Sequence, residues 1–118
     1  MDGPAENPGT KPESPKGAVQ IAGAVVLPEH GGNETVTLLN ASNRAVDVTG
    51  WAIANKAKRK VKLQGIIQAG QFMTVPITEP DFLRNKGDII TLLDPNGLKV
   101  AGVSYTKQQA KQGWTILF

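Results

Sequence analysis

A run of five cations is the densest group of chemically functional side chains in this sequence. It comprises Lys56, Lys58, Arg59, Lys60 and Lys62, all within seven residues. Such a run can bind the phosphates of a nucleic acid or of anionic lipid headgroups. It can equally form a solvated edge strand on which lysine prevents edge-to-edge pairing. Because no aromatic residue interleaves the cations for base stacking, we favour the guarded edge and keep polyanion binding as the alternative.

The strand period arranges these cations. Side chains alternate between the two faces of a strand, so Lys58, Lys60 and Lys62 are predicted to share one face, with Arg59 and Val61 on the other. The formal charge of the whole chain is +3, and residues 18–118 carry 11 basic and 7 acidic side chains. This mild excess is too small to imply nucleic-acid binding by itself.

Metal-binding chemistry has few possible ligands here. The chain has no cysteine, which excludes disulfides and thiolate metal sites. His30 is the only histidine, with Glu29 beside it and Glu34 nearby. Zinc sites normally draw on several nitrogen or sulfur ligands, so we expect an exposed turn histidine rather than a ligand. We predict no metal and no cofactor.

Four carboxylates could in principle form a catalytic pair: Glu79, Asp81, Asp88 and Asp94. Glycosidase-type chemistry needs two carboxyl groups that face one cleft. Asp88 and Asp94 occupy a strand start and a turn, where aspartate commonly caps backbone N–H groups. Their spacing also lacks the dense oxygen ligands of a calcium loop. We therefore predict no catalytic residues and expect that the chain is not an enzyme.

Short β-rich runs separated by turn signals fill the chain from residue 18 onward. The spacing predicts an all-β sandwich of seven to nine short strands, with an open barrel as the alternative. At most one short helical turn is expected, near residues 107–112. The predicted strand regions are 18–27, 34–40, 46–54, 63–69, 72–77, 87–93, 98–105 and 114–118, and residues 56–62 are expected to form a basic hairpin or edge.

The best specified element is the hairpin from Gly87 to Tyr105. Its turn is Asp94-Pro95-Asn96-Gly97, in which Pro95 presets φ and Asp94 can cap the backbone. Trp51 and Trp114 could stack on a ligand, but each lies in an apolar run, so core packing is favoured. The predicted structural core comprises Val36, Leu38, Trp51, Ile53, Ile90, Leu92, Val103, Tyr105 and Trp114.

Glycine and proline mark further local features. Gly23 lies inside the first strand and suggests a bulge or a close backbone approach. Gly50 is expected to bend the chain so that Trp51 turns inward. Pro76 cannot donate a ladder hydrogen bond, so it marks an edge or a strand end. The loop 78–86 is expected to cover the apolar pair Phe82 and Leu83.

Residues 1–17 differ in composition from the rest. They contain four prolines and three glycines and lack an apolar face, which predicts a disordered linker ahead of a domain at 18–118. A linker suggests another domain before it, and a native disordered tail is the alternative. No apolar run has the roughly 20 residues of a membrane helix. The lack of a signal sequence and of cysteine favours the cytoplasm, although an upstream segment could carry a signal.

Three sequence motifs together resemble the lamin tail domain. They are NETVTLLN at 33–40, VDVTGW at 46–51 and GDIITLLDPNG at 87–97. The stretch from Gly97 to Phe118 is most similar to the C-terminal domain of the uncharacterised bacterial YukJ-like proteins, in which such a domain follows an N-terminal one. The resemblance implies an immunoglobulin-like β-sandwich and brings no assigned catalytic residue.

The basic run departs from this family pattern, because many lamin tail sequences have acidic or polar residues after the GW motif. Partners of nuclear lamins therefore do not transfer to this chain. The leading hypothesis is a non-catalytic accessory or interaction module tethered to another domain. Its partner would be a protein or the chain's own upstream domain. Nucleic-acid or anionic-lipid binding through residues 56–62 is the weaker alternative.

Overall fold

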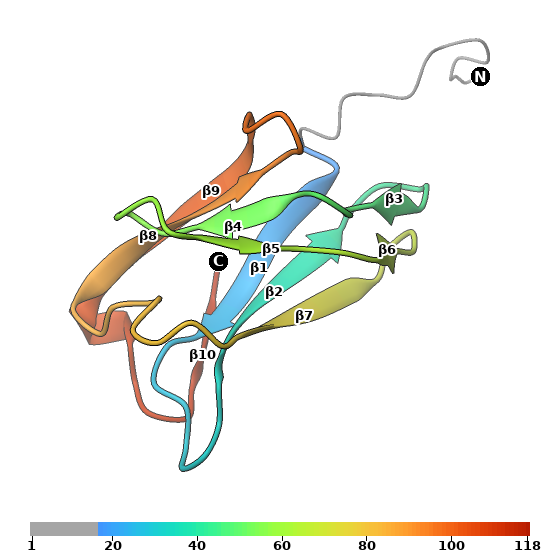
Figure 1. The fold of residues 1–118 in the computed structure, drawn as a ribbon. Helices are drawn as coiled ribbons and strands as arrows, with labels where there is room; N and C mark the ends of the chain where they lie inside the picture. The colour runs from blue at the N-terminus through green and yellow to red at the C-terminus, as the bar shows by residue number, and fades with distance from the viewer. Residues whose placement is uncertain (1–16) are drawn as a thin grey trace, which may run out of the picture.

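The computed structural model describes residues 17–118, which form ten strands and one short 3-10 turn (Figure 1). The predicted linker at 1–17 lies outside the described residues, apart from Gly17. The elements are β1 (Val19–Val25), β2 (Glu34–Asn40), β3 (Val46–Asp47), β4 (Ala52–Ala54), β5 (Lys60–Lys62), β6 (Ile66–Ile67), β7 (Phe72–Ile77), β8 (Gly87–Leu93), β9 (Lys99–Thr106), η1 (Lys107–Gln109) and β10 (Thr115–Leu117).

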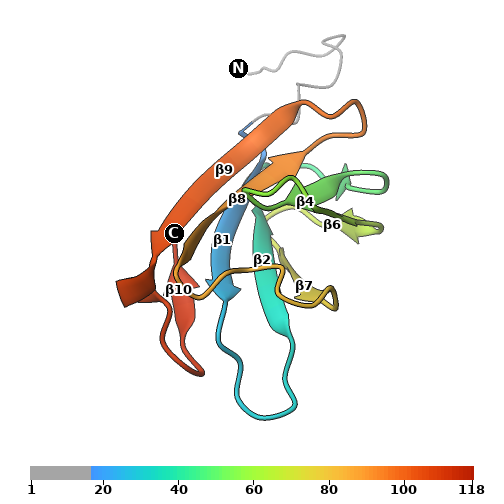
Figure 2. The ribbon, with the colours of Figure 1, turned by 60° about the vertical axis from the view of Figure 1, so that its left-hand side comes forward.

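Two four-stranded antiparallel sheets face each other across the core (Figures 1 and 2). One has the strand order β10-β1-β2-β7 and the other the order β5-β4-β8-β9, while β3 and β6 form a separate two-stranded pair. The predicted all-β sandwich is confirmed. Ten strands are found instead of seven to nine, because the expected strand 46–54 is divided at the Gly50 bend into β3 and β4.

The core lies between the sheets and follows the period-two alternation of the strands. In β2, Val36 and Leu38 are buried and their neighbours are partly exposed. Seven of the nine predicted core residues are buried: Val36, Leu38, Trp51, Ile53, Ile90, Leu92 and Tyr105. Val103 is half-buried. Further buried side chains from β1, β6 and β7 complete the same cluster.

The prediction that Trp114 belongs to the core is wrong, because its side chain is 65% exposed. Alternation within β10 would have placed it beside the buried Ile116. However, Trp114 precedes β10 and lies in a turn, where its N–H donates to the carbonyl oxygen of Lys111 at 3.1 Å. The Lys111 ammonium lies 5.2 Å from the centre of the indole ring. The tryptophan therefore packs against its own turn.

Gly23 shows both features that its position suggested. The β1–β2 register shifts between Ile21 and Gly23, which is a β-bulge. A Cβ atom at Gly23 would lie 3.0 Å from the carbonyl oxygen of Ile116. The missing side chain therefore lets β10 approach closely enough to pair with β1.

The Gly50 bend positions Trp51 as predicted. Gly50 has a φ of 86°, in the left-handed region that favours glycine. The N–H of Trp51 then donates to the carbonyl oxygen of Val48 at 3.0 Å, and the indole becomes buried. The bend directs the chain from the small β3–β6 pair into the sheet that contains β4.

The β8–β9 hairpin closes through its aspartate. Oδ1 of Asp94 accepts the N–H groups of Asn96 at 2.8 Å and Leu98 at 2.9 Å. The loop that precedes β8 buries Phe82 and Leu83, as predicted. This loop packs beside the β4–β5 hairpin, which matters for the site described below.

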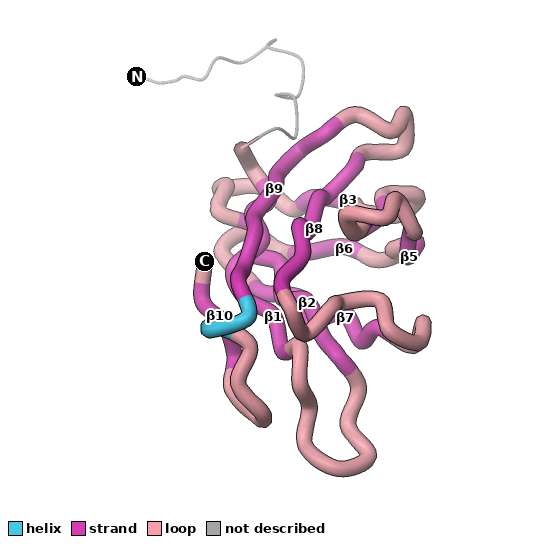
Figure 3. The backbone as a smooth tube through the Cα atoms, turned by 90° about the vertical axis from the view of Figure 1, so that its left-hand side faces the viewer, coloured by secondary structure: helices cyan, strands magenta, loops and turns pink. Residues whose placement is uncertain are grey.

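The chain crosses between the sheets after β9. Figure 3 shows the η1 turn at the end of β9 and the connection onward to β10, which pairs with β1 of the opposite sheet. This turn agrees with the short helical turn expected near 107–112. In the part of the chain that the structure describes, no helix combines the length and apolar character that crossing a bilayer requires.

Candidate functional site

The basic run forms the tip and outer strand of the β4–β5 hairpin. The tip is closed by Asn55, whose carbonyl oxygen accepts the N–H of Lys58 at 2.9 Å and whose Oδ1 accepts the N–H of Arg59 at 2.9 Å. Lys58 has a φ of 68°, a left-handed conformation that this tight tip imposes on a lysine. The following residues form β5, which is the last strand of its sheet.

Buried polar groups fix this hairpin to the rest of the molecule. The amide of Asn55 donates to the carbonyl oxygen of Phe82 at 2.9 Å. The N–H of Lys56 donates to Oδ1 of Asp88 at 2.9 Å, and the Asp88 side chain is only 4% exposed. The two contacts hold the backbone of the hairpin against the loop 78–86 and the start of β8. These contacts therefore fix the backbone positions from which the lysine side chains extend.

Arg59 lies apart from the lysines. Its guanidinium pairs with the Glu79 carboxylate at 2.8 Å and donates to the carbonyl oxygen of Pro80 at 3.0 Å. It also lies over the ring of Phe82, 5.7 Å from the ring centre. Arg59 was predicted as a member of the basic binding site. In the structure it contacts the loop 78–86, on the opposite side of the hairpin from the lysines.

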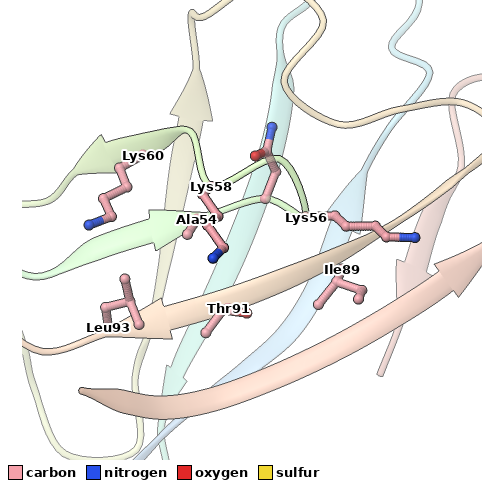
Figure 4. Close-up of a pocket in the computed structure, with 8 residues that line it drawn as sticks. Ala54, Lys56, Lys58, Lys60, Ile89, Thr91 and Leu93 are labelled. Atoms are coloured by element: carbon pink, nitrogen blue, oxygen red, sulfur yellow. The ribbon is translucent and has the colours of Figure 1, made fainter. Parts of the chain in front are cut away.

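Three of the lysines line one side of an open depression on the outer face of the sheet β5-β4-β8-β9. The depression has a volume of about 450 Å³ (Figure 4). Its rim carries Lys56, Lys58 and Lys60, and its floor is largely aliphatic. The floor residues are Ala54, Ile89, Thr91 and Leu93, with Asn55 at the hairpin tip.

The strand registers explain how these residues meet. Ala54 of β4 pairs with Lys60 on one side and with Thr91 of β8 on the other. In the next row, Ala52 pairs with Lys62 and Leu93. Small alanines in β4 therefore separate the lysine row from the β8 side chains and leave the face hollow. Lys62 continues the cationic row beyond the residues that line the depression.

The rim is electrostatically uncompensated. Within residues 17–118, the salt bridge formed by this hairpin is the one between Arg59 and Glu79. The ammonium groups of the four lysines 56, 58, 60 and 62 have no carboxylate within 4.0 Å in that part of the chain. Several like charges beside an apolar floor create a field that attracts an anionic ligand and offers it apolar contact.

The floor of the depression was not among the predicted site residues, and β8 was predicted only as part of the scaffold. The signal was present in its alternation. Ile90 and Leu92 face the core, and the residues between and beside them, Ile89, Thr91 and Leu93, face outward. A fully solvated outer face would carry polar residues at all three positions, whereas Ile89 and Leu93 are apolar. Ile89 is instead one of the exposed large apolar side chains of the described chain.

The other side chains considered for metal binding or catalysis lie apart from one another or already accept hydrogen bonds from the backbone. His30 is exposed in its turn. Asp88 and Asp94 accept backbone N–H groups, as expected for capping aspartates. Among residues 17–118, no three His, Asp or Glu side chains converge as a metal site would require.

A second depression, of about 330 Å³, lies beside the loop 78–86 and has Glu34, Asp81, Arg84 and Lys86 in its lining. Burial raises the pKa of Glu34 above its ordinary value, and the N–H of Leu83, which donates to Oε1 at 2.9 Å, opposes that rise. The lining mixes acidic and basic groups, so it provides no charge of one sign to select a ligand.

Comparison with models of protein families identifies the family to which the fold points. A family model described as the Lamin Tail Domain matches residues 12–107. The matched segment includes the β4–β5 hairpin and the β8–β9 hairpin, and it ends before β10. A comparison with curated proteins found no match.

Proposed function

Because the chain belongs to the lamin tail domain family, we propose that it is a non-catalytic interaction module with an immunoglobulin-like fold. Its binding surface is the lysine-rimmed depression on the outer face of β5-β4-β8-β9. One observation carries the proposal: Lys56, Lys58 and Lys60 line one depression with a largely apolar floor, and their ammonium groups have no carboxylate within 4.0 Å among residues 17–118. Immunoglobulin-like domains of this family often serve in protein interactions.

The ligand of this surface is an anionic segment of a protein partner. The ammonium groups favour carboxylates or phosphates, and the aliphatic floor favours a ligand that also has apolar side chains. A nucleic acid or an anionic lipid headgroup is the second candidate, which the density of lysines supports. The lining has no aromatic side chain on which a base could stack, and this favours the protein partner.

The module acts as part of a larger protein. The Pro- and Gly-rich composition of residues 1–17 supports a tether to another domain, and the domain itself then begins at residue 18. The similarity of the stretch from Gly97 to Phe118 to the YukJ-like proteins supports a bacterial, two-domain origin. In that arrangement the partner is a separate protein or the preceding domain. The absence of cysteine is in keeping with a cytoplasmic setting.

The absence of catalysis is supported by how the carboxylates are used. Both oxygens of Asp88 accept backbone N–H groups, and Oδ1 of Asp94 accepts two. Asp88 lies near Glu34, whose pKa is raised by burial and, less strongly, by Asp81 and Asp88, but backbone N–H groups already occupy both oxygens of Asp88. The residues with catalytic potential thus serve the backbone of the fold.

The test is a binding titration of the full chain with a labelled polyglutamate peptide, followed by fluorescence anisotropy at several salt concentrations. A variant with Lys56, Lys58 and Lys60 changed to Gln should lose about tenfold in affinity or more, and its remaining binding should depend less on salt.

The matched control changes Lys86, Lys107 and Lys111 to Gln, which removes the same charge from three lysines that do not line the depression. If both triple variants weaken binding equally, net charge explains the interaction and the proposed surface is wrong. Binding that is insensitive to salt would also contradict the proposal.

A further inference from the structure

The edge strand β5 presents unpaired backbone groups beside its lysines. Hydrogen bonds fix the orientation of its peptide groups: Asn55 donates to the carbonyl oxygen of Arg59 at 3.1 Å, and Leu63 donates to that of Trp51 at 2.8 Å. Between these two, Ile53 faces Val61 in the register. Residues opposite each other in an antiparallel pair alternate between bonded and non-bonded pairs.

This alternation determines which groups remain free. Arg59, Val61 and Leu63 direct their N–H and C=O groups toward β4. Lys60 and Lys62, which occupy the non-bonded pairs with Ala54 and Ala52, therefore direct theirs away from the sheet. Because β5 ends the strand order β5-β4-β8-β9, no described strand pairs with that side.

The side chains of the same two lysines lie on the outer face, two residues apart. Positions i and i+2 of a strand are separated by about 7 Å, which is also the spacing of alternate residues in any strand that pairs with it. Opposite charges that face each other across two strands stabilise the pairing, and like charges weaken it. The edge therefore has both a backbone template and a charge pattern.

We propose that β5 takes up an extended segment of a protein partner with Asp or Glu at alternate positions, which adds an antiparallel fifth strand to the sheet. The acidic side chains pair with Lys60 and Lys62. The residue between them faces the side of Val61, which is half-buried and packs against the core. An apolar residue suits that position, so the recognised pattern alternates acidic and apolar side chains.

The backbone of β5 selects a peptide over the other anions. A pairing strand must supply an N–H donor and a C=O acceptor at each outward position, and a peptide does this at the strand spacing. A phosphodiester chain has acceptors but no repeated N–H donors. A second copy of β5 is disfavoured as well, because antiparallel pairing of two copies would bring lysines opposite lysines.

This inference rests on the proposed function and specifies how its surface engages a protein. The test compares two peptide probes of equal length and composition against the full chain. One alternates glutamate and valine throughout, and the other repeats Glu-Glu-Val-Val, in which no two glutamates are two residues apart. The alternating peptide should bind about tenfold more tightly, because only it forms the ladder and both charge pairs together.

Amide hydrogen exchange gives a residue-level result. Saturation with the alternating peptide should slow the exchange of the Lys60 and Lys62 amides. Val61, whose amide already faces β4, serves as the internal control and should change little. A form of the alternating peptide with N-methylated valines and glutamates keeps the charge but cannot donate, and it should neither bind as tightly nor protect the two amides.

The outcomes separate the two proposals. If the two peptides bind equally and neither protects Lys60 or Lys62, strand addition is overturned and the lysine-rimmed surface remains as a purely electrostatic site. If a single-stranded oligonucleotide binds more tightly than the alternating peptide, strand addition is also overturned. If neither peptide binds and polyglutamate does not bind, the proposed function fails together with this inference.

Discussion

Replacement of Asp88 by Asn tests the link between the fold and the lysine-rimmed surface. Oδ1 of Asp88 accepts the N–H groups of Lys56 at 2.9 Å and Ile89 at 2.8 Å, and Oδ2 accepts that of Arg84 at 3.2 Å. The side chain is almost fully buried. In Asp88→Asn, one oxygen becomes an NH₂ group, so a donor then faces a donor. The alternative amide orientation would break two bonds instead of one.

The magnitude follows from the bonds affected. A hydrogen bond to a charged acceptor contributes about 1.5–3 kcal/mol, and the two retained bonds weaken when the charge is lost. We therefore expect Asp88→Asn to lower the free energy of unfolding by about 2–4 kcal/mol. With a urea m-value of about 2 kcal/mol/M, the middle of the range for small proteins, the unfolding midpoint should fall by roughly 1–2 M.

Asp94→Asn provides the matched control. Asp94 accepts its two N–H groups through Oδ1 alone, and an amide oxygen can replace that acceptor. We expect a change within about 1 kcal/mol, because the exposed turn keeps both bonds. Urea titrations of both variants, followed by tryptophan fluorescence, make the comparison. If Asp88→Asn costs no more than Asp94→Asn, the two-oxygen role assigned to Asp88 is wrong.

Three further predictions concern the core and its edges. Burial raises the pKa of Tyr105, the only tyrosine, so the folded protein should show no tyrosinate absorbance near pH 10, where the tyrosine of an unfolded chain ionises. The contribution of this group to stability is complete below that pH and falls as the pH rises toward the folded pKa. Coincident titration curves for the native and unfolded protein would refute this prediction. Trp51→Ala should cost about 3–5 kcal/mol in urea unfolding and Trp114→Ala less than about 1 kcal/mol, and equal costs would contradict the observed exposures. Gly23→Ala should destabilise by about 1–3 kcal/mol because its Cβ meets the Ile116 carbonyl oxygen, which an unchanged midpoint would disprove.

The predictable parts of the fold are those that depend on local sequence. The alternation of Val36 and Leu38 identifies the buried face of one strand from its own residues, and the turn that Asp94 begins closes through its own side chain. Trp114 could not be placed this way. Its exposure depends on where β10 begins, and this start is set by a turn and by pairing with β1, far earlier in the chain.

The site was partly predictable for the same reason. The basic run is visible in the sequence itself. That Arg59 faces the other side of the strand from the lysines follows from strand alternation within a few residues. The apolar floor did not follow, because it requires β8 to pair with β4, and Ile89 and Leu93 lie more than 30 residues after the lysine run begins at Lys56. The capping role of Asp88 was expected, but its contact with Lys56 depends on that same long-range packing.

The lysines of β5 both discourage unwanted strand pairing and contribute to the proposed binding edge. Lys60 and Lys62 oppose pairing with an apolar strand, because such a strand would desolvate their charges. They also oppose pairing with β5 of a second copy of the chain, because lysine would then face lysine. The same charges favour a strand with acidic residues at the matching spacing. Protection against indiscriminate pairing thus becomes selection of one pattern, because specificity depends on what an interface rejects as well as on what it accepts.

A variant with Lys60 and Lys62 changed to Val should therefore bind the alternating glutamate and valine peptide less well and should self-associate, which sedimentation analysis would detect. A variant that stays monomeric and keeps its peptide affinity would show that these lysines neither guard nor select.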